Sequence, residues 1–145
     1  MNSISKTSEL KSKIFVLNSL TNRFDGEYLS NLNLSVTQAK ILFLLKNSTR
    51  NEICQKDISA CFGITHSTCS EILDRLKEKG LITEYVSAKD RRRKVIKLTD
   101  AGDKICSEFN DGVKRTEERL NLGISDEELD ALIGILNKMI NNMKS

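Results

Sequence analysis

The sequence predicts a mainly α-helical chain with one small β-hairpin, and three observations support this fold class. Apolar residues recur at helical steps of three and four along most of the 145 residues. The sequence has no proline, a residue that breaks helix interiors. Two short runs rich in β-branched residues lie close together, at residues 81–86 and 94–98. The length suits one domain with additional helices used for assembly.

Amphipathic helices are expected at both ends of the chain. Apolar residues follow one helical face over residues 10–28. Ser125 and Glu128 match the capping box that opens a helix, and apolar spacing continues over residues 129–143. Such helices either close the core of a monomer or pair with a second copy. We expect pairing, through apolar residues of both helices: Leu10, Ile14, Leu17, Leu132, Leu136, Met139 and Ile140.

Three further helices are expected between the two ends. Ser35 and Gln38 form a second capping box, which opens a helix through residues 41–45. That helix is apolar almost all round, so we expect it to be central and buried. Residues 55–62 read as a short helix that ends at Gly63, because glycine suits the left-handed position after a helix. Thr65 can cap the next helix, which continues to about residue 79.

The order of the elements predicts a winged helix-turn-helix. A short helix, a glycine turn and a capped second helix are followed by a hairpin over residues 81–98. Thr99 then caps a long polar helix that runs to about residue 120. We expect residues 35–99 to form the winged helix-turn-helix domain, flanked by dimerisation helices in residues 1–34 and 100–145.

The second helix of such a motif lies in the major groove of DNA. If Cys69, Leu73 and Leu76 face the core, the opposite face carries polar side chains. Serine and threonine hydroxyls there can donate or accept hydrogen bonds, so they tolerate several bases. The residues expected near DNA on this helix are Thr65, His66, Ser67, Thr68, Ser70, Glu71 and Arg75.

The hairpin is strongly basic. Residues 74–97 hold nine basic and four acidic side chains, whereas residues 100–130 hold four basic and ten acidic ones. Like charges cluster at a cost unless a polyanion neutralises them, which favours DNA as the partner. An arginine at the tip can enter the minor groove, and Asp90 can orient it through a paired hydrogen bond. The wing residues expected at DNA are Asp90, Arg91, Arg92, Arg93 and Lys94, with phosphate contacts from Lys77, Lys79 and Lys97.

Several of these segments together resemble the MarR family of transcriptional regulators. They are residues 62–68, 73–82, 90–92, 98–102 and 125–128, so the resemblance covers nearly the whole chain. The combination of an Asp-x-Arg wing with Leu-Thr-x-x-Gly at this spacing is specific. The resemblance implies a homodimer that binds a palindromic DNA operator. It also implies that Asp90 and Arg92 are the paired residues of the wing and that Arg92 enters the minor groove.

The family resemblance also implies release from DNA by a small aromatic or phenolic ligand bound between the two domains, or by cysteine oxidation. Phe24, Tyr28 and Phe43 lie on helices that would meet near such a pocket, as core residues or as ligand contacts. The sensing cysteine of the peroxide-responsive branch lies in the first helix, where this sequence has none. Cys54 precedes the helix that begins at Gln55, and a thiol at a helix N-terminus can be reactive. It is the candidate for a redox-sensing alternative.

Other classes of function find little support in the sequence. No paired carboxylates, glycine-rich phosphate loop or nucleophile–base pattern indicates an enzyme or a cofactor. The cysteines include no C-x-x-C pair, so a metal site is not expected, and Cys61 and Cys69 fall on apolar positions typical of core residues. The longest apolar run, residues 41–45, is too short to span a membrane, which indicates a cytoplasmic protein. A winged-helix protein-interaction module remains the alternative to a DNA-binding regulator.

Overall fold

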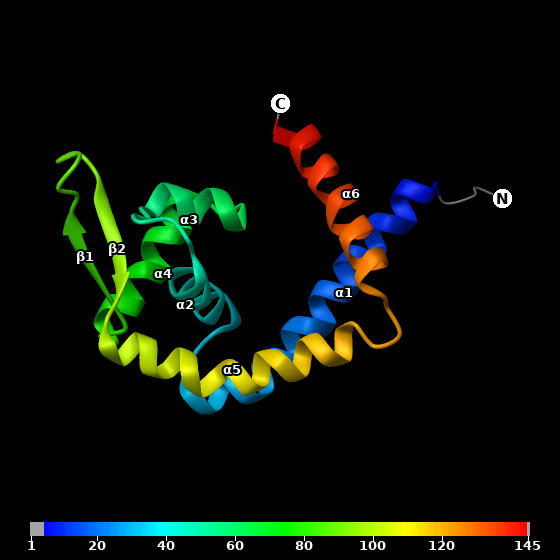
Figure 1. Ribbon diagram of the computed structural model, residues 1–145, viewed down its shortest axis with the longest axis horizontal. Helices are drawn as coiled ribbons and strands as arrows, with labels where there is room; N and C mark the ends of the chain where they lie inside the picture. Colours follow the sequence, from blue (N-terminus) through cyan, green and yellow to red (C-terminus); the bar gives the residue numbers. More distant parts are fainter. Residues whose placement is uncertain (1–4, 145) are drawn as a thin grey trace.

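The computed structural model describes residues 5–144, and its elements follow the predicted order (Figure 1). The mainly α fold with one β-hairpin is confirmed. In chain order the elements are α1 (Lys6–Leu29), the short 3-10 helix η1 (Ser30–Leu32), α2 (Val36–Asn47), α3 (Gln55–Phe62), α4 (His66–Glu78), β1 (Ile82–Val86), β2 (Lys94–Leu98), α5 (Asp100–Leu120) and α6 (Asp126–Lys144).

The elements are arranged along the length of α5. The hairpin β1–β2 stands at one end of α5, and α6 with the first half of α1 lies at the other end (Figure 1). Between them, α2 packs against both α1 and α5, and α3 and α4 pack against each other. The helix-turn-helix and its wing therefore form one body, and the two terminal helices extend away from it.

The predicted helix starts are confirmed by hydrogen bonds of their capping residues. The Ser35 hydroxyl accepts the backbone N–H of Gln38 at 3.1 Å, while the Gln38 side chain accepts the N–H of Ser35 at 3.1 Å. The same reciprocal pair joins Ser125 and Glu128. These side chains satisfy N–H groups that the first turn of a helix leaves without a partner, which explains why each helix begins where it does.

Thr99 and Gly102 connect the start of α5 to the turn before β1. The Thr99 hydroxyl accepts the N–H of Gly102 at 3.1 Å and donates to the carbonyl of Gly80 at 2.6 Å. The backbone N–H of Thr99 donates to the Leu81 carbonyl at 3.1 Å. At Gly102 a Cβ atom would collide with that carbonyl oxygen. The Leu-Thr-x-x-Gly pattern thus closes the base of the wing against α5.

The hairpin gains a third, very short partner that the sequence does not predict. Strands β1 and β2 pair antiparallel, with Ile82 opposite Leu98 and Val86 opposite Lys94. In addition, the N–H of Ile96 donates to the Ile53 carbonyl at 2.8 Å, and Cys54 forms an isolated bridge with Val95. The segment that leads into α3 therefore fixes the wing to the helix-turn-helix.

The core lies where α2, α3, α4, the hairpin and α5 meet, and two expectations about burial are wrong. Ile41, Leu42 and Phe109 are almost fully buried. Phe43, on the helix expected to be buried nearly all round, is 39% exposed, because it faces a cavity between α1, α2, α3 and α5 rather than the core. Cys61 was expected in the core but is exposed on α3, whereas Cys69 is fully buried as expected.

The terminal helices leave apolar surface uncovered in the single chain. Within residues 5–144, α6 has no buried residue and α1 buries only Leu29. Among the residues expected at a dimer interface, Leu10 and Leu136 are half-buried, whereas Ile14, Leu17, Leu132, Met139 and Ile140 are exposed. No helix among these residues is long and apolar enough to cross a membrane.

Candidate DNA-binding surface and ligand pocket

The helix-turn-helix is held together by a sharp turn and a small apolar contact. Gly63 adopts the left-handed conformation, with φ of 62°, which lets α4 leave α3 at a steep angle. Ile58 of α3 and Cys69 of α4 are fully buried, and Leu73 is nearly so. This contact turns the opposite face of α4 toward solvent.

The first turn of α4 contains polar groups that are hydrogen-bonded within the chain and one side chain that is not. The Thr65 hydroxyl accepts the N–H of Thr68 at 3.1 Å and so caps the helix. The Gln55 amide donates to the backbone carbonyl of His66 at 3.1 Å and lies beside its ring. Ser67 is exposed, and its side chain has no hydrogen-bond partner within residues 5–144. Thr65 therefore has a capping role, and Ser67 is the residue of this turn most available to a base edge.

Further along α4, three predicted contact residues lie on its solvent side. Glu71 and Arg75 are exposed, and Ser70 is half-buried. Glu71 and Arg75 are one helical turn apart, yet no ion pair joins them in the described part of the chain. The Arg75 guanidinium is therefore available to an external acceptor such as a guanine or a phosphate.

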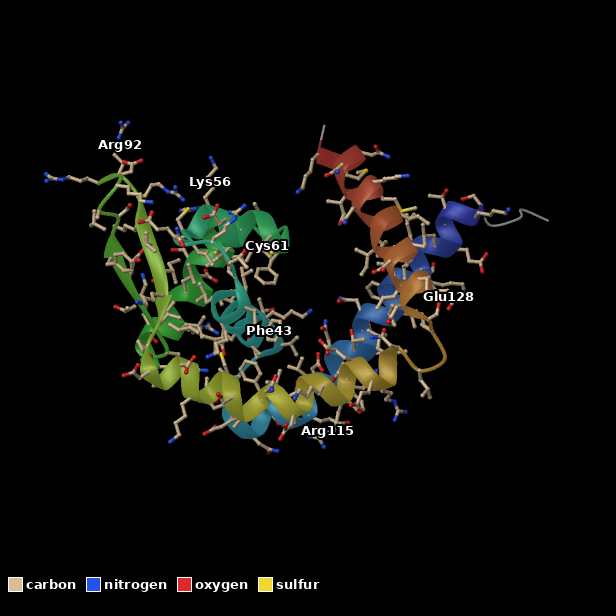
Figure 2. All side chains as sticks on the ribbon, in the orientation of Figure 1. Phe43, Lys56, Cys61, Arg92, Arg115 and Glu128 are labelled. Carbon is tan, nitrogen blue, oxygen red and sulfur yellow. The ribbon has the colours of Figure 1, made fainter. Side chains whose placement is uncertain are left out.

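Arg92 occupies the tip of the wing. Its side chain is 96% exposed and points away from the body of the protein (Figure 2). Asp90 Oδ1 accepts the backbone N–H of Arg92 at 3.0 Å, whereas the Arg92 Nε atom lies 3.9 Å away. At this distance the two side chains of the described wing form a long ion pair and not the expected paired hydrogen bond. Asp90 supports the backbone of Arg92, and the guanidinium reaches outward into solvent.

Arg93 points in a different direction from its neighbours. Its guanidinium lies 3.5 Å from Asp57 Oδ2 and donates to the Cys54 sulfur at 3.4 Å. The contact with Cys54 raises the pKa of Arg93 further. Arg91 and Lys94 are exposed. These contacts make Arg93 a link between the wing and the start of α3, and its contact with DNA stays a prediction.

Two of the three lysines expected at phosphates have partners within the chain. Lys77 Nζ lies 2.6 Å from Glu84 Oε2 on β1. Lys79 Nζ donates to the carbonyl of Asn33 at 2.5 Å and to the Gln38 side chain at 3.1 Å. Lys97 is exposed without an ion pair in residues 5–144. The distances thus favour Lys97 as a phosphate contact over Lys77 and Lys79. The partners of Lys79 lie more than forty residues earlier in the chain, so spacing could not indicate them.

A basic residue that the sequence analysis did not select also lies near this surface. Lys56 is exposed in the first turn of α3, and its side chain points to the same side as the wing tip (Figure 2). The first helix of a helix-turn-helix crosses the DNA backbone, so a cation at its start suits a phosphate. Its place in the first turn of that helix was the available sequence signal.

An apolar cavity lies between α2 and α3 on one side and α1 and α5 on the other. Its volume is about 520 Å³, and its walls come from α1, α2, α3 and α5. Two of the three aromatic residues expected near a pocket, Tyr28 and Phe43, line it; Phe43 and Cys61 are labelled in Figure 2. Phe24 does not line it; this ring belongs to a neighbouring groove, where the Arg119 guanidinium lies 5.5 Å from its centroid.

Two polar groups of this cavity, Asp25 and Thr116, lie near Tyr28. Burial, together with the nearby Asp25 carboxylate, raises the pKa of Tyr28, which therefore remains a neutral phenol and a hydrogen-bond donor. The Thr116 hydroxyl donates to Asp25 Oδ1 at 2.5 Å. The Tyr28 ring packs directly over Gly112, where a Cβ atom would overlap it. Glycine at this position of α5 therefore sets the depth of the cavity.

The thiols differ in their surroundings. Cys54 donates from its sulfur to Asp57 Oδ2 at 3.2 Å, and its backbone N–H donates to the same oxygen at 3.0 Å. Burial raises the pKa of Cys106 and so keeps that thiol protonated. Across residues 5–144, no three His, Cys, Asp or Glu side chains are grouped in a way that could hold a metal ion.

A helix-turn-helix with an exposed polar second helix and a cationic hairpin defines a winged helix-turn-helix protein. A sequence model of the MarR family matches residues 32–93. The transcription regulator MarR from Oenococcus oeni PSU-1 is 30% identical, with 90% of this chain and 97% of that chain covered and a TM-score of 0.76.

Two structures of MepR from S. aureus are also similar. MepR in its DNA-binding conformation is 27% identical, with coverage of 92% of this chain and 98% of that one and a TM-score of 0.85. A MepR–DNA complex is 26% identical, with 97% and 99% covered and a TM-score of 0.78. The chain therefore belongs to the MarR family and is a DNA-binding transcription regulator.

Proposed function

We propose that the protein binds a palindromic DNA operator as a homodimer and represses transcription there. The observation that carries this proposal is the wing tip, where Arg92 is almost fully exposed beside the helix-turn-helix. A guanidinium held this way suits the narrow and negative minor groove. The exposed polar face of α4 suits the major groove next to it.

The homodimer would cover the apolar surface of the terminal helices. Exposed apolar residues recur along α1 and α6, including Phe15, Leu20, Ile133 and Met143. A surface of this kind on a single chain usually marks an interface. Two copies joined there would present two winged helices, and their spacing would match half-sites about one turn of DNA apart. The domain division at residues 34 and 99 is part of this proposal.

The cavity between α1, α2, α3 and α5 is the proposed effector site. It is lined mainly by apolar and aromatic groups, including Tyr28 and Phe43, with few polar groups. This composition fits a small aromatic or phenolic molecule. Because its walls join α3 of the helix-turn-helix to α1 and α5, a bound molecule would change the separation of the two DNA-binding units and release the operator.

Selection of bound duplexes from a random DNA pool tests this proposal. The expected result is a palindrome whose half-sites are centred about 10 base pairs apart. A purified dimer that enriches no sequence at moderate salt would instead favour a winged-helix module for protein interaction. Repression is tested separately, by placing the selected site over a promoter and measuring reporter output with and without the protein.

A further inference from the structure

One buried hydroxyl group connects the wing tip to the rest of the chain. Ser87 follows β1 and is 1% exposed. Its Oγ lies 3.0 Å from both carboxylate oxygens of Glu52, and the backbone N–H groups of Lys89 and Asp90 donate to it at 3.2 Å. A serine hydroxyl has one proton to donate and two lone pairs that accept. All of this capacity is used at Ser87.

Glu52 determines which way the Ser87 hydroxyl is oriented. An ionised carboxylate can only accept, so the hydroxyl proton points to Glu52 and the lone pairs face the two backbone N–H groups. The second of these groups belongs to Asp90, whose carboxylate accepts the backbone N–H of Arg92 at 3.0 Å. A chain of hydrogen bonds therefore runs from Glu52 through Ser87 and Asp90 to the backbone of Arg92.

The segment that carries Glu52 is itself fixed. The neighbouring Ile53 carbonyl accepts the N–H of Ile96 at 2.8 Å, and Ile53 and Ile96 are both buried. Cys54, the next residue, bridges Val95 of β2. Glu52 thus lies on a segment that is hydrogen-bonded to β2, whereas the residues that it supports form the exposed tip.

The negative charge of Glu52 stabilises the neighbouring cations of the wing but does not itself favour DNA binding. Glu52 lies beneath a tip that carries five cations among residues 89–94, and its negative charge lowers the potential that attracts phosphates. Its contribution to DNA binding must therefore be geometric. We propose that Glu52 and Ser87 are positioning residues that hold the wing tip so that Arg92 can enter the groove. This inference rests on the proposed function of the wing.

Three variants separate the charge of Glu52 from its hydrogen bond. Glu52→Ala removes both, and Glu52→Gln removes the charge but keeps an acceptor for Ser87. Glu84→Ala is the matched control, because Glu84 lies on β1 of the same hairpin and bonds Lys77 rather than the tip. Affinity for the selected duplex is measured by fluorescence anisotropy at fixed salt, after thermal unfolding confirms that each variant is folded.

The sign of the effect is the decisive readout. We expect Glu52→Ala to weaken binding about 5-fold, the equivalent of one lost hydrogen bond. Glu52→Gln and Glu84→Ala should bind as tightly as the wild type or more tightly, since each removes a negative charge near DNA. Ser87→Ala should weaken binding like Glu52→Ala and provides the test if the latter does not fold. Binding by Glu52→Ala that matches Glu84→Ala would overturn the proposal.

A double-mutant cycle with Arg92→Ala shows whether the effect passes through the wing tip. If Glu52 acts by positioning Arg92, then Glu52→Ala should cost less than about 2-fold once Arg92 is gone. An equal loss in both backgrounds would mean a general structural role and would overturn the proposal. Should Arg92→Ala alone bind normally, the proposed wing contact fails and this inference with it. If only Arg92→Ala weakens binding, the wing contact stands and the role of Glu52 is refuted.

Discussion

Gly102 is the position where a single methyl group should disturb the joint between the wing and α5. Its backbone runs so close to the turn before β1 that a Cβ atom would lie 3.0 Å from the Leu98 side chain and closer still to the Leu81 carbonyl oxygen. The carbonyl cannot rotate away like a flexible side chain, because it accepts the N–H of Thr99 at 3.1 Å. In Gly102→Ala, α5 or the turn must therefore shift.

The expected cost follows from two opposing effects. Alanine favours a helix over glycine by about 1 kcal/mol, whereas forcing an extra methyl group into a packed site costs about 1–3 kcal/mol, and more when backbone must move. We expect Gly102→Ala to lower the free energy of unfolding by about 2 kcal/mol. For a chain of this size that corresponds to a fall in Tm of about 4–8 °C.

Gly26→Ala is the matched control for this measurement. Gly26 also lies inside a helix, but nothing is within 4 Å of the place where its Cβ would lie. The same substitution there should raise stability by up to about 1 kcal/mol. Both variants are unfolded by heat and by urea at one protein concentration, since the proposed dimer would link stability to concentration. A Gly102→Ala protein as stable as Gly26→Ala would refute the close approach between α5 and the turn.

Three further perturbations address the dimer, the ion pair between Asp57 and Arg93 of the wing, and the cavity. Glutamate at both Leu17 and Leu136 should produce monomers in analytical ultracentrifugation and weaken operator binding at least 100-fold; a monomer that still binds tightly would contradict the dimer proposal. The pKa of Asp57 is lowered mainly by the backbone N–H of Cys54, and to a smaller extent by the Cys54 thiol and two arginines. The ionised Asp57 therefore stabilises the fold above the ordinary carboxyl pKa, and this contribution is lost as the pH falls below that range. Asp57→Asn should therefore flatten the acid limb of stability measured by urea unfolding, and an unchanged acid limb would show that Asp57 contributes nothing there. Gly112→Ala should push the Tyr28 ring into the cavity and reduce the affinity of an aromatic ligand about 10-fold in calorimetry; equal affinity would place the ligand elsewhere.

The fold was predictable because the signals that start and end its helices are local in sequence. Four helices begin at a residue whose side chain accepts a backbone N–H three residues later: Ser35, Thr65, Thr99 and Ser125. Gly63 ends α3 by its own backbone preference. Such signals need no knowledge of the tertiary structure.

The roles of individual charged residues were less predictable, because their partners are distant in the chain. Lys79 is held by groups on the segment before α2 and on α2, more than forty residues earlier. Glu52 meets Ser87 across 35 positions. Cys61 follows an apolar pattern, yet it is exposed and faces the apolar cavity rather than the core. Periodicity identifies a face of a helix but cannot tell what covers that face.

The salt dependence of operator binding shows whether the wing reads DNA sequence. Wild type, Arg92→Ala and Lys97→Ala are each titrated against the selected duplex and a scrambled duplex at several salt concentrations. Wild type should prefer its site at least about 1,000-fold. Arg92→Ala should lose about 10- to 100-fold of that preference, whereas Lys97→Ala should weaken both duplexes alike and reduce the salt slope by about 1. Equal affinity of the wild type for the two duplexes, or an Arg92→Ala protein with full preference, would contradict DNA reading by the wing.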